Sequence, residues 1–286
     1  MKIQQVVRKS MEIRESGRSS DYISPSFGHG CLFNCSYCYM KRHKPTGLSV
    51  AKNIGEILTK INNHVYFYSQ VAKPNQTHEK YITYDISCNE DFALHANQYN
   101  WEYIFEFFKN HPKAMATFAT KTVPHKLLKF NPEKKVRIRF SLMPENIRKV
   151  LEPGTSTIKK RIEAVDKFID AGYDVHLNFS PVIVYKGWLE DYKKLFKSVD
   201  KGIKQKETVK AEVIFLTHNK DKHQYNLDNN LPGEDLLWNP EIQDTKISQY
   251  GGENIKYGYG KKAVFINAFK TLHNDIIPWN QIRYIF

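Results

Sequence analysis

Apolar runs that are rich in β-branched and aromatic residues alternate with amphipathic stretches along most of the chain. This alternation is typical of repeated βα units around a parallel sheet. The apolar runs predict strands at Tyr22–Phe27, Tyr81–Ser87, Ala114–Ala119, Val136–Ser141, Val175–Ser180 and Ala211–Thr217. The helical spacing of apolar residues predicts helices at Ile54–Asn62, Tyr99–Asn110, Thr157–Ala171 and Leu189–Val199. Gly172 stands where a C-cap glycine would end the third of these helices.

Six βα units of this kind predict an α/β fold, a partial (β/α)6 barrel whose active face lies at the carboxyl ends of the strands. A doubly wound open sheet is the competing architecture. The regular alternation stops after residue 217. We therefore expect a barrel core over residues 1–217 and a C-terminal extension over residues 218–286, within one compact domain.

The predicted extension is polar at 218–230, loop-like around Pro232-Gly233, and rich in glycine and tyrosine at 249–262. It either covers the barrel or meets the substrate, and its Gly/Tyr-rich segment is a candidate hairpin or a surface loop. Residues 276–286 are apolar enough to return as a terminal strand, with Pro278 limiting regular pairing.

Basic residues outnumber acidic ones by 43 to 30 among the 286 residues, which gives a formal net charge of +13. A surface with this surplus attracts a polyanion, and nucleic acid is the commonest candidate. Because the lysines are scattered along the chain, solubility is an alternative explanation. The apolar stretches are too interrupted to span a bilayer, and the first residues lack the apolar core of a secretory signal. We therefore expect a cytoplasmic protein that does not bind membranes.

Three of the four cysteines lie within eight residues, directly after the first predicted strand. The spacing of Cys31, Cys35 and Cys38 is a poor pattern for disulfides and a good one for a metal site. A structural zinc takes four closed ligands, whereas a [4Fe–4S] cluster on three cysteines keeps one iron open for an outside ligand. A zinc site completed by His29 or His43 is the alternative.

The Cys-x3-Cys-x2-Cys spacing, with Tyr37 just before the last cysteine, resembles the cluster loop of radical S-adenosylmethionine (SAM) enzymes. Further blocks, met in the same order along the chain, make it similar to the spore photoproduct lyases within that superfamily. These blocks are Ile86–Asp91, Phe118–Lys121, Arg137–Ser141, Glu152–Ser156 and Lys256–Lys261.

The resemblance implies a [4Fe–4S] cluster on the three cysteines, SAM bound at the open iron, and an electron donor such as flavodoxin or ferredoxin. In that family the radical derived from SAM acts on a thymine photoproduct in DNA, and the DNA is thus the implied partner. A base inside a duplex must leave the stack before its atoms can be reached. A basic groove and an inserted element, for which 249–262 is a candidate, are expected for this reason.

By the same resemblance, Cys88 corresponds to the cysteine that returns a hydrogen atom to the thymine radical. Tyr39 and Tyr257 correspond to tyrosines that relay the hydrogen atom back towards SAM. Lys121 and Ser141 correspond to residues near the SAM carboxylate. The alternative interpretation makes Cys88 a small buried hydrophobe and the two tyrosines packing residues.

Tyr37 and Glu90 are also expected to lie against the cofactor. Glu90 is at the same time a departure from the family, because the repair enzymes commonly follow the donor cysteine with Thr-Ser-Asp and this chain has Asn89-Glu90-Asp91. Lys256-Tyr257 replaces an Arg-Tyr pair and loses the planar fork suited to phosphate, and the family's N-terminal extension is missing. These departures keep two alternatives open: a radical SAM enzyme that modifies a nucleic-acid base or nucleoside, and a non-catalytic zinc protein that binds nucleic acid.

Overall fold

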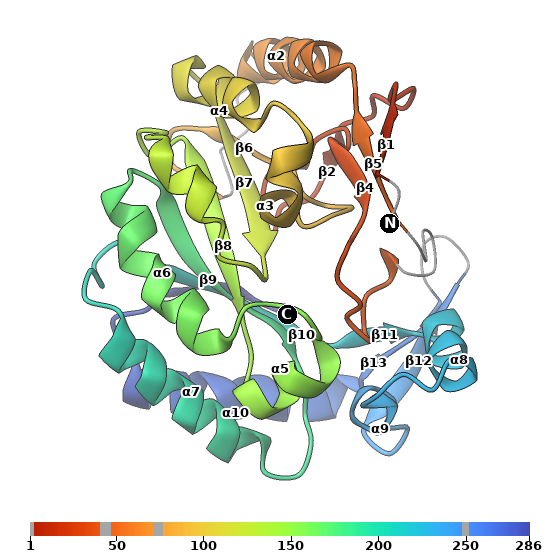
Figure 1. Ribbon diagram of the computed structural model, residues 1–286. Coiled ribbons are helices and arrows are strands. Elements are labelled where there is room, and N and C mark those ends of the chain that lie inside the picture. Colours follow the sequence, from red (N-terminus) through yellow and green to blue (C-terminus); the bar gives the residue numbers. More distant parts are fainter. Residues whose placement is uncertain (1–2, 41–46, 71–76, 248–251) are drawn as a thin grey trace. The chain divides into compact units, whose positions relative to one another are not determined.

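The computed structural model describes residues 3–40, 47–70, 77–247 and 252–286 (Figure 1). Its strands are β1 Ile3–Val6, β2 Arg14–Glu15, β3 Tyr22–Ile23, β4 Gly28–Gly30, β5 Leu48–Ala51, β6 Ile82–Asp85, β7 Ala114–Thr120, β8 Val136–Leu142, β9 Asp174–Val182, β10 Lys210–Phe215, β11 Thr217–Asn219, β12 Gln243–Ile247, β13 Glu253–Tyr257 and β14 Ile282–Ile285. Its α-helices are α2 Ile54–Gln70, α3 Phe92–His95, α4 Trp101–Asn110, α5 Glu145–Leu151, α6 Ile158–Asp170, α7 Trp188–Gly202, α8 Lys220–Asp228, α9 Glu234–Leu237 and α10 Tyr259–Ile276. Two 3-10 turns, η1 Ala96–Gln98 and η2 His125–Lys129, complete the described elements.

The main sheet has the strand order β14-β10-β9-β8-β7-β6-β3-β2. Its neighbours from β3 through β8 run parallel, as do β10 and β14, whereas β2 joins β3 antiparallel. All of β8 and all but one residue of β7 are buried. Strand β7 is mostly apolar, as expected of a strand buried on both faces. Strand β8 alternates apolar residues with Arg137 and Arg139, whose buried side chains pair with Asp174 and Asp85. The parallel α/β sheet predicted from the alternation is confirmed.

The first predicted strand is shorter in the structure, and the last one is divided in two. The strand expected at Tyr22–Phe27 ends at Ile23, and the chain next enters β4, which belongs to a separate sheet with the order β1-β5-β4. The last one is broken at Leu216, whose N–H donates to the Val182 carbonyl at 3.0 Å. Gly172 has a φ of +91° after α6, so the predicted C-cap glycine is confirmed.

The region after residue 217 holds more structure than its polar sequence predicts. Helix α8 lies in the polar stretch 218–230, for which no element was predicted, and the Asn219 side chain caps it by accepting from the N–H groups of Asp221 and Lys222. Strands β12 and β13 pair antiparallel, so a hairpin exists, although it begins earlier than the candidate segment 249–262. Residues 249–251 of that segment lie outside the described residues. Helix α10 was not predicted, and β14 lies within the expected terminal strand.

The chain divides into two compact units, each assembled from several segments. The first unit comprises Met1–Leu32, Lys44–Phe140 and Val165–His176, and the second comprises Phe33–His43, Ser141–Ala164 and Leu177–Phe286. The boundary predicted at residue 217 falls inside the second unit, at the start of β11. Among the described residues, no helix is both long and apolar enough to cross a membrane.

Each unit has an aromatic core of its own. Phe92, Phe105 and Phe118 meet in the first unit with ring centroids 5.3 to 6.0 Å apart. In the second unit, Phe269 of α10 lies 5.3 Å from Phe196 of α7, centroid to centroid. Phe269 is fully buried, and its burial is what fixes α10 in place although the helix begins in a glycine-rich sequence.

Candidate active site

The three cysteines of the motif and Cys88 form no disulfide in the structure. Cys31 follows β4 in the first unit and is partly exposed; Cys35, in the second unit, is buried, and Cys38 is partly exposed. The Cys38 N–H donates to the Cys35 carbonyl at 3.0 Å, which closes a turn between these two residues. Thiols outside disulfides at the three motif positions are the ligands that an iron–sulfur cluster requires.

The turn between Cys35 and Cys38 is held by three separate segments of the second unit. The Ser36 N–H donates to the Leu151 carbonyl at 2.9 Å, and its hydroxyl donates to the Pro232 carbonyl at 3.0 Å. The Asn226 side-chain amide donates to the Ser36 carbonyl at 2.8 Å. Both backbone groups and the side chain of this serine are therefore fixed by hydrogen bonds, which orients the turn.

Tyr37, the aromatic residue of the motif, joins a buried ion pair. Its hydroxyl donates a short hydrogen bond to one Glu152 oxygen, while Arg161 Nη2 donates to the other at 2.8 Å. The side chains of Glu152 and Arg161 are 0% exposed. Burial, followed by the charge of Glu152, raises the pKa of the Tyr37 phenol well above its usual value. Tyr37 was expected to lie against SAM. In the structure its hydroxyl donates to Glu152.

Arg161 links this network to the ends of two other elements. Its Nη1 donates to the Ser141 carbonyl at 2.7 Å, in β8, and its Nη2 also reaches the Thr155 hydroxyl at 2.8 Å. Gly154, with a φ of +80°, allows the tight turn in which Glu152 and Thr155 face the same guanidinium. The Glu152–Ser156 block therefore acts as a brace for the cysteine loop. The sequence did not indicate a role for Arg161, because a buried arginine in a polar helix cannot be distinguished by sequence from the exposed charged residues around it.

In the first unit, the residues after β6 form a compact turn around Asp91. One Asp91 oxygen accepts from the Thr120 hydroxyl at 2.8 Å, and the other accepts from the Lys121 N–H at 2.8 Å. The same carboxylate caps α3 by accepting from the Leu94 N–H at 3.1 Å. Asp91 thus ties the end of β7 to the turn that carries Cys88. The sequence analysis names Asp91 only as the end of the Ile86–Asp91 block and predicts no cap there, although an Asp just before an apolar turn is a usual N-cap signal.

Cys88 is partly exposed, and Arg14 Nη2 lies 4.0 Å from its sulfur. Beside Arg14 lies a cavity of about 460 Å³, lined by residues of the first unit only. Arg8 and Lys9 also line it, against the single carboxylate of Glu12. A cavity with this excess of cations suits an anionic ligand.

Glu90 lies beneath this turn rather than in the cavity. Its side chain is 1% exposed, and one oxygen accepts from His95 Nδ1 at 3.0 Å and from the Tyr99 hydroxyl at 2.9 Å. Because the Leu32 N–H donates to His95 Nε2 at 3.3 Å, the ring proton of His95 is on Nδ1, facing Glu90. A Cβ on Gly28 would lie 2.1 Å from a Glu90 oxygen, so a glycine is needed there. Glu90 was expected beside the cofactor. In the structure its carboxylate holds the His95 ring, and the other nitrogen of that ring accepts from the N–H of Leu32, the residue after Cys31.

We expect Glu90→Gln to remove a pH dependence of stability. Burial raises the pKa of the Glu90 carboxyl, although hydrogen bonds from His95 and Tyr99 oppose the rise. The folded chain then keeps a proton that the unfolded chain releases, so the free energy of unfolding falls as the pH rises above the usual value of 4.5. Denaturant unfolding across this range should show a slope of at most about 1.4 kcal/mol per pH unit in the parent and a flatter one in the variant. Glu102→Gln, an exposed glutamate on α4, is the matched control, and a parent slope that survives in Glu90→Gln would contradict the expectation.

The two relay candidates differ in exposure. Tyr257 is 1% exposed, and its hydroxyl accepts from the Val184 N–H at 2.8 Å. Burial raises the pKa of the Tyr257 phenol and this N–H partly offsets the rise, so the hydroxyl keeps its hydrogen at neutral pH. Tyr39 is 45% exposed. Both roles stay predictions.

The two residues expected near the SAM carboxylate each lie at the end of a strand. Lys121 directly follows β7 in the first unit and is partly exposed. Ser141 lies near the end of β8 in the second unit, and its hydroxyl accepts from the Asn178 amide at 3.5 Å. These strand-end positions are the ones that collect functional groups in α/β barrels. His29 lines the cavity described above, whereas His43, the other alternative zinc ligand, lies outside the described residues.

Comparison with known proteins gives one consistent family. The sequence model of the family described as spore photoproduct lyase matches residues 2–286. Spore photoproduct lyase of Bacillus subtilis is 27% identical over 286 residues, which is 97% of this chain and 80% of that protein. Spore photoproduct lyase of Clostridium acetobutylicum is 25% identical, over 94% of this chain and 79% of that protein. A solved spore photoproduct lyase variant with dinucleoside spore photoproduct has a TM-score of 0.88 at 20% identity, over 99% of this chain and 82% of the other.

The fold and the three-cysteine loop together define a radical SAM enzyme, and the predicted partial barrel is confirmed by the solved structures. The chain belongs to the spore photoproduct lyase family, because the family model covers nearly all of it. It is therefore a lyase, as predicted, and the alternative of a non-catalytic zinc protein is wrong.

Proposed function

We propose that this lyase repairs spore photoproduct in DNA, with Cys88 as the donor of the final hydrogen atom. The main support is the family match across residues 2–286 together with the loop that carries Cys31, Cys35 and Cys38, none of which forms a disulfide. The relatives named above are spore photoproduct lyases, and one of them was solved with the dinucleoside form of that lesion. We further propose a cytoplasmic enzyme that takes electrons from a donor such as flavodoxin or ferredoxin.

In this proposal Cys31, Cys35 and Cys38 hold a [4Fe–4S] cluster, and Lys121 and Ser141 contact the carboxylate end of SAM. When bound, the cluster and SAM supply the 5′-deoxyadenosyl radical that abstracts a hydrogen atom from the lesion. The buried pair of Glu152 and Arg161 keeps the cysteine loop in one conformation, through Tyr37. A rigid supporting shell of this kind is what holds reactive groups in place.

Cys88 completes the reaction in this proposal. Its S–H bond breaks, the hydrogen atom passes to the thymine radical, and an unpaired electron stays on the sulfur. Tyr39 and Tyr257 would then give a hydrogen atom to the sulfur, which restores the thiol, and take one in turn from the SAM side, so that the unpaired electron returns to where the reaction began. Arg14, 4.0 Å from the sulfur, together with Arg8 and Lys9 would bind the phosphate backbone next to the lesion.

Glu90 no longer favours the alternative of base modification. The sequence favours that alternative because Glu90 places a carboxylate where the repair enzymes commonly have a small hydroxyl residue. Because Glu90 accepts from His95 and Tyr99 and is 1% exposed, the substitution belongs to the support of the loop and requires no different substrate.

The test is an anaerobic assay of the reconstituted chain with a chemical reductant, SAM and dinucleoside spore photoproduct. We expect 5′-deoxyadenosine and restored thymine, and we expect Cys31→Ala to abolish both because the cluster loses a ligand. An undamaged thymine dinucleoside is the substrate control. SAM cleavage with no restored thymine would overturn the repair proposal and leave the radical SAM assignment intact.

A further inference from the structure

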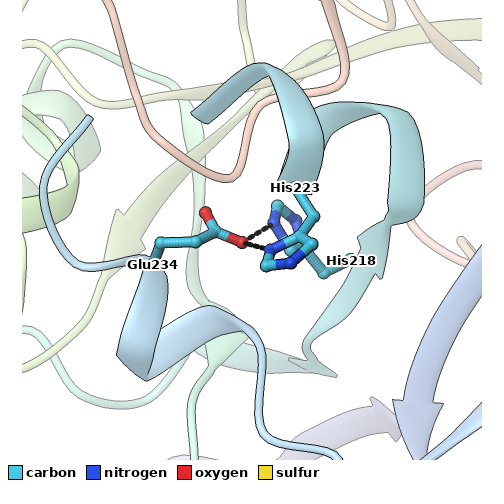
Figure 2. A group of neighbouring side chains, drawn as sticks. All are labelled: His218, His223 and Glu234. Atoms are coloured by element: carbon cyan, nitrogen blue, oxygen red, sulfur yellow. Dashed lines mark hydrogen bonds and ion pairs between the residues drawn. The ribbon is translucent and has the colours of Figure 1, made fainter. Parts of the chain in front are cut away.

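Three side chains outside the cysteine loop converge on one point in the second unit: His218 in β11, His223 in α8 and Glu234 in α9 (Figure 2). His218 Nε2 lies 2.9 Å from Glu234 Oε1, and His223 Nδ1 lies 2.5 Å from the same oxygen. One ligand atom from each residue lies within 4.8 Å of the other two. Three elements that are distinct along the chain thus direct two imidazoles and a carboxylate at a common centre.

The cluster is inside the protein rather than on a solvated face. The side chains of His218, His223 and Glu234 are 0%, 18% and 9% exposed. The Asn226 amide holds the second Glu234 oxygen with a short hydrogen bond, so the carboxylate is fixed on both sides.

The donor set is the one that zinc and similar borderline ions prefer. Two imidazole nitrogens and one carboxylate oxygen are a common three-ligand set for a four-coordinate ion with one open position. A tetrahedral ion with bonds of about 2.0–2.1 Å separates its ligand atoms by about 3.3 Å. Donors that now make hydrogen bonds of 2.9 and 2.5 Å would have to spread by less than about 1 Å to admit the ion.

Neighbouring groups already orient the possible ligands. The Trp238 ring stacks on His223 with centroids 3.9 Å apart and an angle of 11° between the rings. Asn226, which holds Glu234, also donates to the Ser36 carbonyl in the turn between Cys35 and Cys38. Supporting contacts of this type fix the orientation of metal ligands in known sites.

We propose that His218, His223 and Glu234 form a second metal site, for a divalent transition ion of the zinc class. The ion would fasten β11, α8 and α9 to one another and, through Asn226, stiffen the turn that carries Cys35 and Cys38. The site is separate from the cysteine motif and from the radical chemistry, so its occupancy does not depend on the proposed function.

Zinc binding is tested on the full chain with Cys31→Ala, Cys35→Ala and Cys38→Ala, because thiolates also bind zinc. After chelator treatment, equilibrium dialysis should give close to one Zn²⁺ per chain, and Zn²⁺ should raise the unfolding temperature. Co²⁺ should give the visible absorption of a four-coordinate site. In the same background Asn226→Ala should weaken Zn²⁺ binding by about 10- to 100-fold, the usual cost of losing a supporting contact.

His223→Phe should weaken binding by more, since it removes a ligand atom while keeping a ring to stack on Trp238. Glu234→Gln is a second, nearly isosteric test in case His223→Phe folds poorly, and it should also lose the zinc. His125→Phe, at an exposed histidine outside the cluster, is the matched control and should bind like the parent. A parent chain that binds no zinc, or variants at His223 and Glu234 that bind it as well as the parent, would overturn the proposal and leave a hydrogen-bonded cluster.

Discussion

Glu152→Gln is expected to lower the free energy of unfolding by about 3–5 kcal/mol, because it leaves a buried arginine without its counter-ion. The Glu152 and Arg161 side chains are both 0% exposed, and their closest atoms lie 2.8 Å apart. Glutamine keeps the size of the side chain and an oxygen that can accept from Tyr37, so the loss reports the missing charge. For a chain of this size the unfolding temperature should fall by roughly 10 °C.

The control for this prediction is Glu163→Gln, on the same helix as Arg161. Glu163 pairs with Lys159 at 3.8 Å, and the two side chains are 52% and 85% exposed. An exposed pair of this kind contributes less than about 1 kcal/mol, so the control should unfold close to the parent. Thermal unfolding and iron content after reconstitution are measured for both. If Glu152→Gln is no less stable than Glu163→Gln, the buried pair does not brace the cysteine loop.

The sequence predicts the barrel strands well because apolar residues recur in them as short runs or at alternate positions, between amphipathic stretches. Strand β8, expected at Val136–Ser141, extends one residue further, to Leu142. Helix α8 was missed for the opposite reason. Its sequence is mostly polar, and it is fixed by the Asn219 cap and by side chains such as Asn226 that reach other segments. Those contacts have no periodic signature, so only the folded chain shows them.

The candidate site likewise has a part that the sequence indicates and a part that it does not. The cysteines stand out because their spacing is local and their chemistry is unusual. The residues that support them are spread over the chain. Tyr37 and Glu152, for example, share a hydrogen bond although they are 115 residues apart in the sequence. Glu90 looked like a cofactor contact because it lies two residues from Cys88, but neighbouring side chains in a turn can point in different directions. In the structure the Glu90 carboxylate forms a buried hydrogen bond with His95. The distance between two residues in the sequence does not predict such a contact.

These observations suggest how the family chemistry is kept at 27% identity to the Bacillus subtilis enzyme. In the proposed mechanism the reactive groups are few, namely four thiols and the residues proposed to contact SAM. The supporting networks can change composition as long as each buried charge and each hydrogen-bonding group is satisfied. Glu90 with His95 is one such solution in the first unit, and Glu152 with Arg161 is another in the second.

Cys88→Ala is expected to reduce the yield of restored thymine by more than about tenfold while 5′-deoxyadenosine is still formed. The radical on the substrate arises before Cys88 acts, so its formation does not need the thiol. Without an S–H hydrogen to take, the thymine radical reacts with other groups and gives side products. Chromatography of the products from dinucleoside spore photoproduct, together with a count of 5′-deoxyadenosine per lesion consumed, measures both quantities.

Cys88→Ser separates hydrogen donation from packing. Serine keeps the size and polarity of the side chain beside Arg14, but its O–H bond is too strong to quench a carbon radical. We therefore expect Cys88→Ser to fail like Cys88→Ala, with the folded state intact by circular dichroism. Cys88 is partly exposed, so loss of packing alone would cost little in either variant. Full restoration of thymine by both variants would show that another group donates the hydrogen atom, and the exposed Tyr39 would then be the first residue to test.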